Sequence, residues 1–484
     1  MTTVSGTADI LTYVAQLIDL ERQSGAGKVY RQDRDALTRR SATLTDLRSH
    51  LNVLDGQAQA FGRPGALSPF AARTVTSSAG AVATATATAG ARTGTHTLLV
   101  TQLAKRSTVV SAQWSRTGTE VASAAGAGSH TIRVTVDGVD TQVTVTVGAA
   151  DDNATVLNAM AAAINASGAK VSASVVHDTD STARVVLRSD ETGSAHAIGL
   201  ADESGTLAAS TGIDSGVPSS GAAGGFLYAG DQLDARVVLD GLAIVRGKNT
   251  VEDVLPGVTF TLLSPHAAAA APATLTVGPD QEAIRAKAQA FLDAYNTAIK
   301  FLKERTQVSV SVQTTSAGTT DVTSVTRGTL ASESAYLGLL RHLRSDVGGR
   351  IETAGPNGPA ALSEIGITAG KDGTLSLSDA TRFAKALTED ADGVAALFNS
   401  SDGIAARVSA RLRGFLTSGG RVDSALEAVT SRLQSVNRAI AQQETYLKAK
   451  QATLVQQYSR LQETLLRLQG QQAELDAVLS SITW

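Results

Sequence analysis

The side chains that carry most enzyme chemistry are few in this sequence and occur singly. Seven histidines are present, none at the H-x-x-x-H or H-E-x-x-H spacing that brings two imidazoles to one metal ion. Cysteine is absent, which excludes thiolate nucleophiles, disulfides and cysteine-ligated metals. The sequence also lacks a phosphate-binding loop, a dinucleotide-binding glycine motif and a serine nucleophile elbow. We therefore predict no catalytic, cofactor-binding or metal-binding residues, and a protein that is not an enzyme.

The segment HDTDS at 177–181 is the one stretch that suggests a cation loop, through Asp178 and Asp180. A calcium loop of twelve residues would close with a bidentate carboxylate, which is missing here. Aspartate in a turn between two strands is the commoner explanation. We expect a turn at this position.

Charge and hydropathy exclude two further classes of partner. Lys and Arg together number 42 against 45 for Asp and Glu, a net charge of −3. That balance gives no field to attract nucleic acid or anionic lipid. No apolar run is long enough to span a membrane, and the start lacks the basic region and cleavage site of a secretory signal. We expect a chain that is cytoplasmic or exported without a cleaved signal.

Near the C-terminus an apolar residue recurs every seventh position, the signature of a coiled-coil seam. If helical throughout, this seam spans about 85 Å at 1.5 Å per residue. Its members are Leu426, Leu433, Ile440, Leu447, Leu454, Leu461, Leu468, Leu475 and Ile482. The second seam is apolar at Val429, Val436 and Val478, but polar in its middle, at Gln443, Lys450, Gln457, Thr464 and Gln471. This helix therefore has half of what a self-sufficient two-stranded coil needs.

The N-terminal region has the complementary pattern. Apolar spacing predicts a helix over 10–20, an interruption at SGAG (24–27) and a second helix over 30–61. The second helix is the predicted intramolecular partner of the C-terminal seam, in a hairpin stalk formed by both ends. An ordinary internal packing stripe is the alternative to an assembly interface. Our candidate interface comprises Leu37, Leu44, Leu51, Leu433, Ile440, Leu447, Leu454, Leu461, Leu468, Leu475 and Ile482.

The middle of the chain, about 66–277, is rich in Val, Thr and Ala in short alternating runs, which predicts strands. VDGVD at 136–140 has the Asp-Gly signal of a tight hairpin. A short helix is expected over 151–168, with Val156, Leu157, Met160 and Ile164 on one face. The Gly- and Ser-rich segment 212–225 has little to bury and is predicted to be a linker.

Helical periodicity returns after residue 280. One stripe combines Ile284, Ala288, Phe291, Tyr295, Ile299 and Leu302. A polar gap over 306–328 precedes a helix near 334–347, and 362–378 reads as a hairpin turning at Asp372-Gly373. Further helical runs complete a mainly helical block.

Several motifs in order resemble the flagellar hook-associated protein 2 family of bacterial filament caps. They include GTADILTYVAQLIDLERQ at 6–23, GTHTLLVTQLA at 94–104, AQAFLDAYNTAIKFLKERT at 288–306 and LSEIGITAGKDGTLSLS at 362–378. Residues 145–176 are similar to the flagellin hook IN motif, a strand–helix–strand unit. The resemblance covers essentially the whole chain and is weakest at about 115–225.

The resemblance implies an α+β multidomain fold with a coiled-coil leg, a mixed helical domain and two nested β-rich head domains. The expected divisions are 1–40 with 440–484 for the leg, 41–80 with 277–439 for the helical domain, 81–118 with 225–276 for the first head domain, and 119–224 for the inserted head domain.

The resemblance also implies a function. It indicates a ring-like homo-oligomer at the distal filament tip that promotes flagellin folding and insertion, and export through the flagellar type III apparatus. The partners implied are flagellin, the hook–filament junction protein and a cytoplasmic export chaperone, with no cofactor. Two alternatives stay open: a tip-displayed adhesin that binds host glycans or mucin through the head, and a junction protein.

Overall fold

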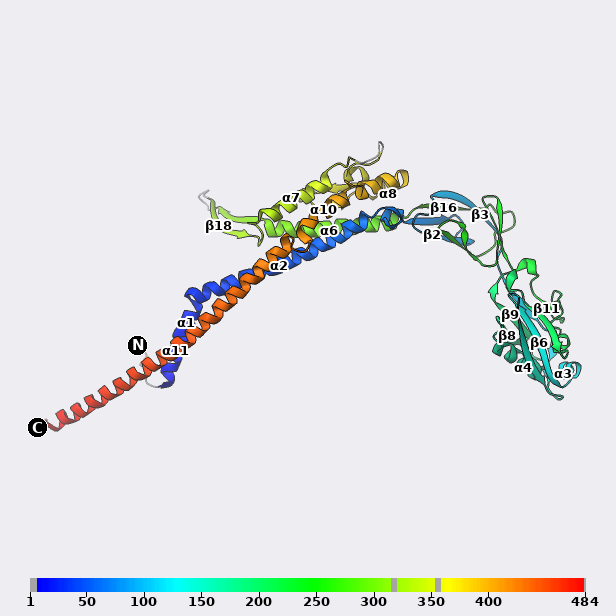
Figure 1. Cartoon of the computed structure of the whole chain (residues 1–484), viewed down its shortest axis with the longest axis horizontal. Helices are drawn as coiled ribbons and strands as arrows, with labels where there is room; N and C mark the ends of the chain where they lie inside the picture. The colour runs from blue at the N-terminus through cyan, green and yellow to red at the C-terminus, as the bar shows by residue number, and fades with distance from the viewer. Residues whose placement is uncertain (1–6, 315–319, 353–357, 483–484) are drawn as a thin grey trace. The chain divides into compact units, whose positions relative to one another are not determined.

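A computed structural model describes the backbone of residues 7–314, 320–352 and 358–482, and the side chains of residues 11–311, 324–352 and 358–480. The chain forms two compact units. One is continuous, residues 65–280, and the other joins residues 1–64 to residues 281–484. The fold is α+β and multidomain, with strands gathered in the first unit and long helices in the second (Figure 1).

The helical unit is built from both ends of the chain. Its helices are α1 (Thr7–Gln23), α2 (Gly25–Phe61), α6 (Gln281–Thr306), α7 (Ser334–Gly348), α8 (Ala380–Glu389), α9 (Ala391–Asn399), α10 (Ile404–Leu416) and α11 (Arg421–Ile482). The last of these is a single helix of 62 residues. Helix α2 contacts α6, α10 and α11, and so lies at the centre of the unit.

The predicted interruption between the first two helices is a single residue wide. Ser24 is extended, and Gly25 has a φ of 57°, a value that glycine adopts without steric cost. Gly27 is also required here, because a Cβ on it would lie 2.9 Å from the carbonyl oxygen of Arg22. The chain therefore turns sharply between α1 and α2.

The apolar stripe predicted for α6 is confirmed. All six of its members are buried. The ring of Phe291 joins Phe61 and Phe398, and the last two meet edge to face with centroids 4.6 Å apart. Burial also raises the pKa of the Tyr295 hydroxyl. Aromatic packing thus ties α2, α6 and α9 into one core.

Two hairpins interrupt the helices of this unit. Strands β19 (Ile367–Ala369) and β20 (Leu375–Leu377) pair around a loop where Gly373 has a φ of 87°, which confirms the predicted Asp-Gly hairpin. The prediction of a polar gap over 306–328 was wrong. It contains the antiparallel ribbon of β17 (Val308–Thr314) and β18 (Thr320–Arg327), because Val and Ser alternate along β17 with the period of a strand.

The β-rich unit contains four sheets. Their strand orders are β1-β16-β3-β12-β13, β14-β15-β2, β10-β6-β7 and β11-β4-β9-β5, with β8 paired to β9. The bounds are β1 (Arg73–Ser77), β2 (Ala83–Ala87), β3 (Gly94–Gln102), β4 (Arg106–Val110), β5 (Trp114–Ser115), β6 (Gly128–Val136), β7 (Val139–Val147), β8 (Val171–Val176), β9 (Thr182–Thr192), β10 (Gly199–Ser204), β11 (Gly225–Phe226), β12 (Ala235–Leu239), β13 (Leu242–Arg246), β14 (Thr250–Leu255), β15 (Val258–Leu262) and β16 (Ala273–Pro279).

Two hydrophobic cores divide this unit. The first is built from residues 83–104 and 235–277, which come from either side of an intervening segment, and has Phe260 at full burial. The second lies within residues 109–213. One core is therefore inserted in the sequence of the other.

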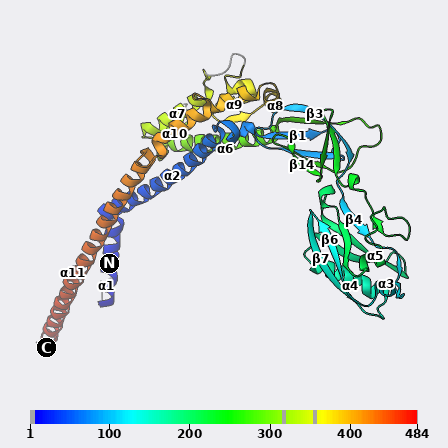
Figure 2. The same ribbon diagram turned by 45° about the vertical axis from the view of Figure 1, so that its right-hand side comes forward.

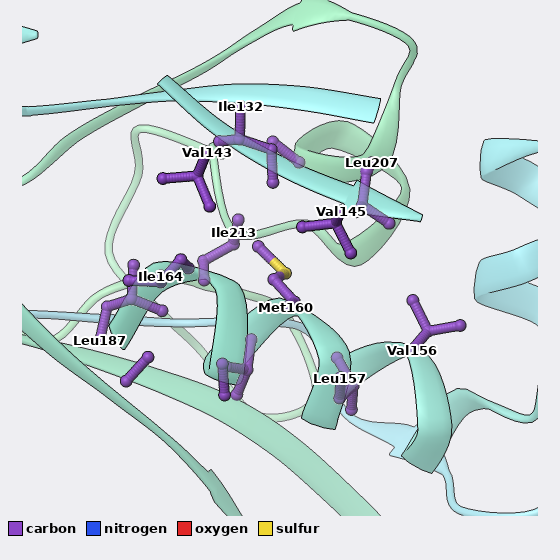
Figure 3. Close-up of a cluster of buried hydrophobic side chains, with 14 of the residues drawn as sticks. Ile132, Val143, Val145, Val156, Leu157, Met160, Ile164, Leu187, Leu207 and Ile213 are labelled. Carbon is purple, nitrogen blue, oxygen red and sulfur yellow. The ribbon is translucent and has the colours of Figure 1, made fainter. Parts of the chain in front are cut away.

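The second core forms between helix α4 (Asn153–Ala166) and the β6–β7 hairpin. Figure 3 shows Leu157 and Met160 of α4 beneath Val143 and Val145 of β7. The predicted helix face is confirmed, and Asp152 caps the helix by accepting a 2.8 Å hydrogen bond from the Thr155 amide. The hairpin turns at the predicted Asp-Gly pair, where both residues have positive φ, as a type I′ turn requires. Two short helices, α3 (Glu120–Ala125) and α5 (Leu207–Thr211), close this core.

The segment 212–225, predicted to be a linker, is largely exposed over residues 215–223 but is anchored at both ends. Ile213 is buried in the second core, and β11 pairs with β4. A Cβ on Gly224 would lie 2.1 Å from the Gly212 carbonyl oxygen, so the chain packs closely through its backbone. Composition pointed to a linker because few side chains are available, but backbone hydrogen bonds and close contact hold this segment in place.

The segment 177–181 lies in the connection between β8 and β9, as predicted for a turn. Its Asp178 carboxylate accepts hydrogen bonds from Gln113, Thr182 and Arg184 at 2.6–2.9 Å. Within the described residues, no group of three or more His, Cys, Asp or Glu side chains is placed to hold a metal ion.

We expect Leu157→Ala to destabilise the β-rich unit by about 2–5 kcal/mol, because a fully buried leucine leaves a cavity when truncated. Chemical denaturation followed by circular dichroism measures the change. Leu242→Ala is the control, since Leu242 is mostly exposed on β13 and should cost less than about 1 kcal/mol. Equal losses in the two variants would contradict the placement of this core.

Candidate assembly interface

The first part of α11 lies antiparallel to α2. Arg48 of α2 pairs with Asp423 at 3.2 Å, and Asp33 pairs with Arg432 at 3.4 Å, so the two helices run in opposite directions. All four side chains are at least partly exposed, which limits what each pair adds to stability. The contact fixes how the two ends of the chain meet.

The valine seam, rather than the leucine seam, faces inward in this first part. Val429 and Val436 are buried, whereas Leu433 and Ile440 are only half-buried. Helix α10 also contacts α11. A heptad drawn for a two-stranded coil does not capture this arrangement.

The middle of α11 packs on α1, not on α2 as predicted. Leu447 is fully buried against Val14 and Ile18 of α1. Leu454 is partly buried beside the same cluster, and the rings of Tyr13 and Tyr458 meet edge to face at 5.7 Å. The sharp turn at Gly25 makes this possible, because it redirects the chain between α2 and α1.

Ion pairs flank this small core, and one of them accounts for Lys450 in the polar second seam. The guanidinium of Arg22 donates to both carboxylate oxygens of Glu444, at 3.0–3.2 Å. Lys450 donates to Glu21 at 2.7 Å. These bonds raise the pKa of Arg22 and of Lys450, each chiefly through the hydrogen bond to its carboxylate. From the sequence, Lys450 was interpreted as a polar interruption of the second seam. The opposite charge of Glu21 was the signal that could have identified Glu21 as the partner of Lys450.

The last part of α11 presents an apolar face to solvent. Leu461, Leu468 and Leu475 are 55%, 52% and 64% exposed, and Leu465 and Leu479 are also at least half exposed. These five leucines are spaced by four, three, seven and four residues, so they share one side of the helix, here called the tail face. Figures 1 and 2 show α11 extending past α1. The side chain of Ile482 lies outside the described residues.

The candidate leucines of α2 are internal. Leu44 and Leu51 are completely buried within the helical unit, and Leu37 is half-buried. Of the eleven predicted positions, the structure therefore separates the ten with described side chains into a packed or half-buried group and three leucines of the exposed tail face, Leu461, Leu468 and Leu475. The tail face is suited to helix association, since an exposed apolar stripe on a long helix can pack against another helix.

Comparison with known proteins agrees with this architecture. The sequence profile of the flagellar hook-associated protein 2 N-terminus matches residues 6–107, and that of its C-terminus matches residues 233–470. The B-type flagellar hook-associated protein 2 of Pseudomonas aeruginosa is 28% identical over 99% of this chain and 97% of its own length. The A-type protein from the same species is 26% identical over 99% of this chain and 98% of its own length.

A solved structure shares the fold. The D1–D2–D3 domains of the flagellar cap protein FliD from Escherichia coli align with a TM-score of 0.53 at 23% identity, over 80% of this chain and 99% of that one. The architecture is that of a flagellar cap protein. The chain belongs to the flagellar hook-associated protein 2 family.

No helix in the part of the chain that the structure describes has an apolar stretch of the length needed to cross a bilayer. The long helix α11, in particular, carries charged residues throughout its length.

The α1–α11 contact predicts an effect of charge reversal. We expect Lys450→Glu to speed amide hydrogen exchange in residues 13–22, because it places a carboxylate against Glu21. Combining it with Glu21→Lys should restore slow exchange. Lys448→Glu is the control, because position 448 lies on another face of α11. Unchanged exchange in Lys450→Glu would contradict this packing.

The same contact has a defined pH dependence. A lysine whose pKa is raised in the folded state stabilises that state fully below its unfolded pKa. We therefore expect α1 to stay protected through neutral pH and to lose the contribution of Lys450 only above the usual lysine value of about 10.4. Amide hydrogen exchange is too fast to follow at that pH. The solvent accessibility of residues 13–22 is therefore measured by hydroxyl-radical footprinting and mass spectrometry. Loss of α1 protection between pH 7 and 9 would oppose this assignment.

Proposed function

We propose that this chain is a structural cap at the distal tip of the bacterial flagellar filament. In this proposal it forms a ring-like homo-oligomer that promotes the folding and insertion of exported flagellin and prevents its loss. Family membership and the cap-protein fold support the proposal. A cap must bind a growing helical filament while admitting new subunits, which requires association surfaces and no catalytic site.

The observation that carries this proposal is the tail face of α11. Burying a leucine side chain is favourable by about 1.5–3 kcal/mol, so five leucines on one face form a strong association surface. Monomeric proteins rarely leave a continuous apolar stripe in water. A face left open in one chain and covered on assembly couples oligomer formation to stability by mass action.

The proposed partners follow from the same role. They are further copies of this chain, flagellin, the hook–filament junction protein and a cytoplasmic export chaperone. Export through the flagellar type III apparatus would deliver the chain to the filament tip.

The alternative, a tip-displayed adhesin, would need an aromatic platform for sugars on the β-rich unit. Trp114 is the tryptophan of this unit, and it packs partly buried against the second core. Its indole nitrogen donates to the Thr211 carbonyl oxygen at 3.4 Å. This placement favours the cap over the adhesin.

A bacterium that lacks its own copy of this protein provides the test. We expect Leu461→Gln with Leu468→Gln and Leu475→Gln to abolish swimming and filament elongation, because the tail face loses its apolar character. Helical content should remain, since glutamine is a good helix former. The control carries Glu463→Gln, Arg467→Gln and Glu474→Gln on the opposite side of the same turns, and should swim normally.

Immunoblotting of the culture medium separates failure of capping from failure of export. The tail-face variant should be secreted at the level of the control, with flagellin lost to the medium as unpolymerised subunits. Normal filament length with the tail-face variant would refute the proposal.

A further inference from the structure

The β-rich unit consists of two lobes that share no apolar core. The first lobe is built around the first hydrophobic core, from residues 83–104 and 235–277, and the second lobe around the second core, within residues 109–213. Among the described side chains, none belongs to both cores. Relative motion is the default for two such bodies, because a large apolar interface is what normally prevents it. Any restraint between the lobes must therefore come from polar and backbone contacts.

The chain passes between the lobes twice, through residues 105–108 and 227–234, and the two passages are paired with each other. The Lys105 amide donates to the Leu233 carbonyl oxygen at 2.8 Å, and the Leu227 amide donates to the Thr108 carbonyl oxygen at 2.9 Å. The Lys105 ammonium also lies 4.2 Å from the centre of the Tyr228 ring. The covalent link is thus one narrow two-stranded ribbon, a structure that has little rigidity of its own.

A second attachment lies at the end of β9, where the second lobe meets the first. The Ser194 amide and hydroxyl donate to the two carboxylate oxygens of Asp234, at 2.8 and 2.7 Å. The Thr192 hydroxyl donates to the Gly247 carbonyl oxygen at 2.6 Å. Asp234 directly precedes β12 and Gly247 lies between β13 and β14, so both acceptors are held by strands of the first lobe. Thr192, Gly193, Ser194, Asp234 and Gly247 are here called the lobe lock.

Gly193 allows the two backbones to meet inside the lobe lock. It is buried and has a φ of 108°, and a Cβ on it would lie 2.7 Å from the Gly247 Cα. Its amide donates to the Lys105 carbonyl oxygen at 3.0 Å, which ties the lock to the ribbon. The contact is not symmetrical, because a Cβ on Gly247 would lie 3.6 Å from the Gly193 Cα, an ordinary van der Waals distance. Close approach therefore requires glycine on the side of the second lobe.

We propose that the lobe lock holds the two lobes of the β-rich unit as one rigid body, and that its release lets the second lobe turn about the ribbon. The ribbon alone restrains the lobes at one narrow connection. The end of β9 adds a separate contact to the connection between β13 and β14, which removes the remaining freedom to turn. A lock of this kind acts within one chain and is independent of the oligomer of the proposed function. It fixes the angle at which the second lobe presents its surface.

The absence of cysteine allows a probe to be placed on each lobe. Val139→Cys on β7 and Leu242→Cys on β13 each carry a nitroxide spin label, since these side chains are 60% and 71% exposed. The labelled full-length chain is diluted with unlabelled chain, so that pulsed electron double resonance measures distances within one copy. We expect a single narrow distance distribution when the lobe lock is intact.

Gly193→Ala is the variant that opens the lock by steric conflict. Its methyl group would meet the Gly247 backbone, which has to shift, so we expect a distance distribution about twofold broader. Gly247→Ala is the matched control on the facing side of the same contact and should leave the distribution unchanged. Gly126→Ala controls for backbone strain alone, because Gly126 has a φ of 84° but open space where a Cβ would lie.

A second variant removes hydrogen bonds without adding bulk. Thr192→Val combined with Asp234→Ala deletes the side-chain bonds between the lobes and should also broaden the distribution. Slow amide hydrogen exchange in β6 and β7 verifies that the second lobe stays folded in each variant. If Gly193→Ala does not pass this check, the combined variant decides the question alone.

Three outcomes would overturn the lobe lock. The first is a broad distribution in the labelled chain with no substitution in the lock. The second is a distribution that stays narrow and unshifted in both lock variants. The third is equal broadening by Gly193→Ala and by either glycine control, since the close backbone contact would then have no part in holding the lobes.

Discussion

The antiparallel packing of the two chain ends is the constraint on which the rest of this structure depends. Helix α11 pairs with α2 through Asp423 and Arg432, and with α1 through Glu444 and Lys450. Once the ends are joined, everything between α2 and α6 must leave the helical unit and return to it. The β-rich unit is therefore an insertion in the sequence of the helical unit. Within it, the residues of the second core are in turn inserted between the two sequence segments that form the first core.

The ion pairs on α1 show how a polar seam can set register. Among the described side chains at that contact, only Val14, Ile18 and Leu447 form the buried cluster, too few apolar residues to specify one alignment. Arg22 and Glu21 supply the alignment because each meets an opposite charge on α11. A contact of this kind is specific and also easily separated, which suits the export and assembly that we propose for this chain. Beyond Tyr458 the same helix keeps its leucines but has them in solvent.

Several elements could be predicted because their signals are local. The Asp-Gly pair at 137–138 specifies a tight turn in which both residues have positive φ, and the pair at 372–373 marks a longer hairpin loop in which Gly373 does. The stripes of α4 and α6 follow from helical periodicity alone. The β17–β18 ribbon was missed although Val and Ser alternate along β17. The segment 212–225 was misread because composition does not report the backbone hydrogen bonds that hold its ends.

The sequence by itself determined that both ends are helical, that strands fill the middle and that a leucine repeat continues to residue 482. Periodicity records which residues share a face. It does not record what covers that face, because the partner is chosen by contacts distant in the chain. Only the tertiary structure decided that Val436 faces inward while Leu433 is half-buried, and that Leu447 packs on α1. It also decided that Leu468, farther along the same helix, is left half exposed to solvent.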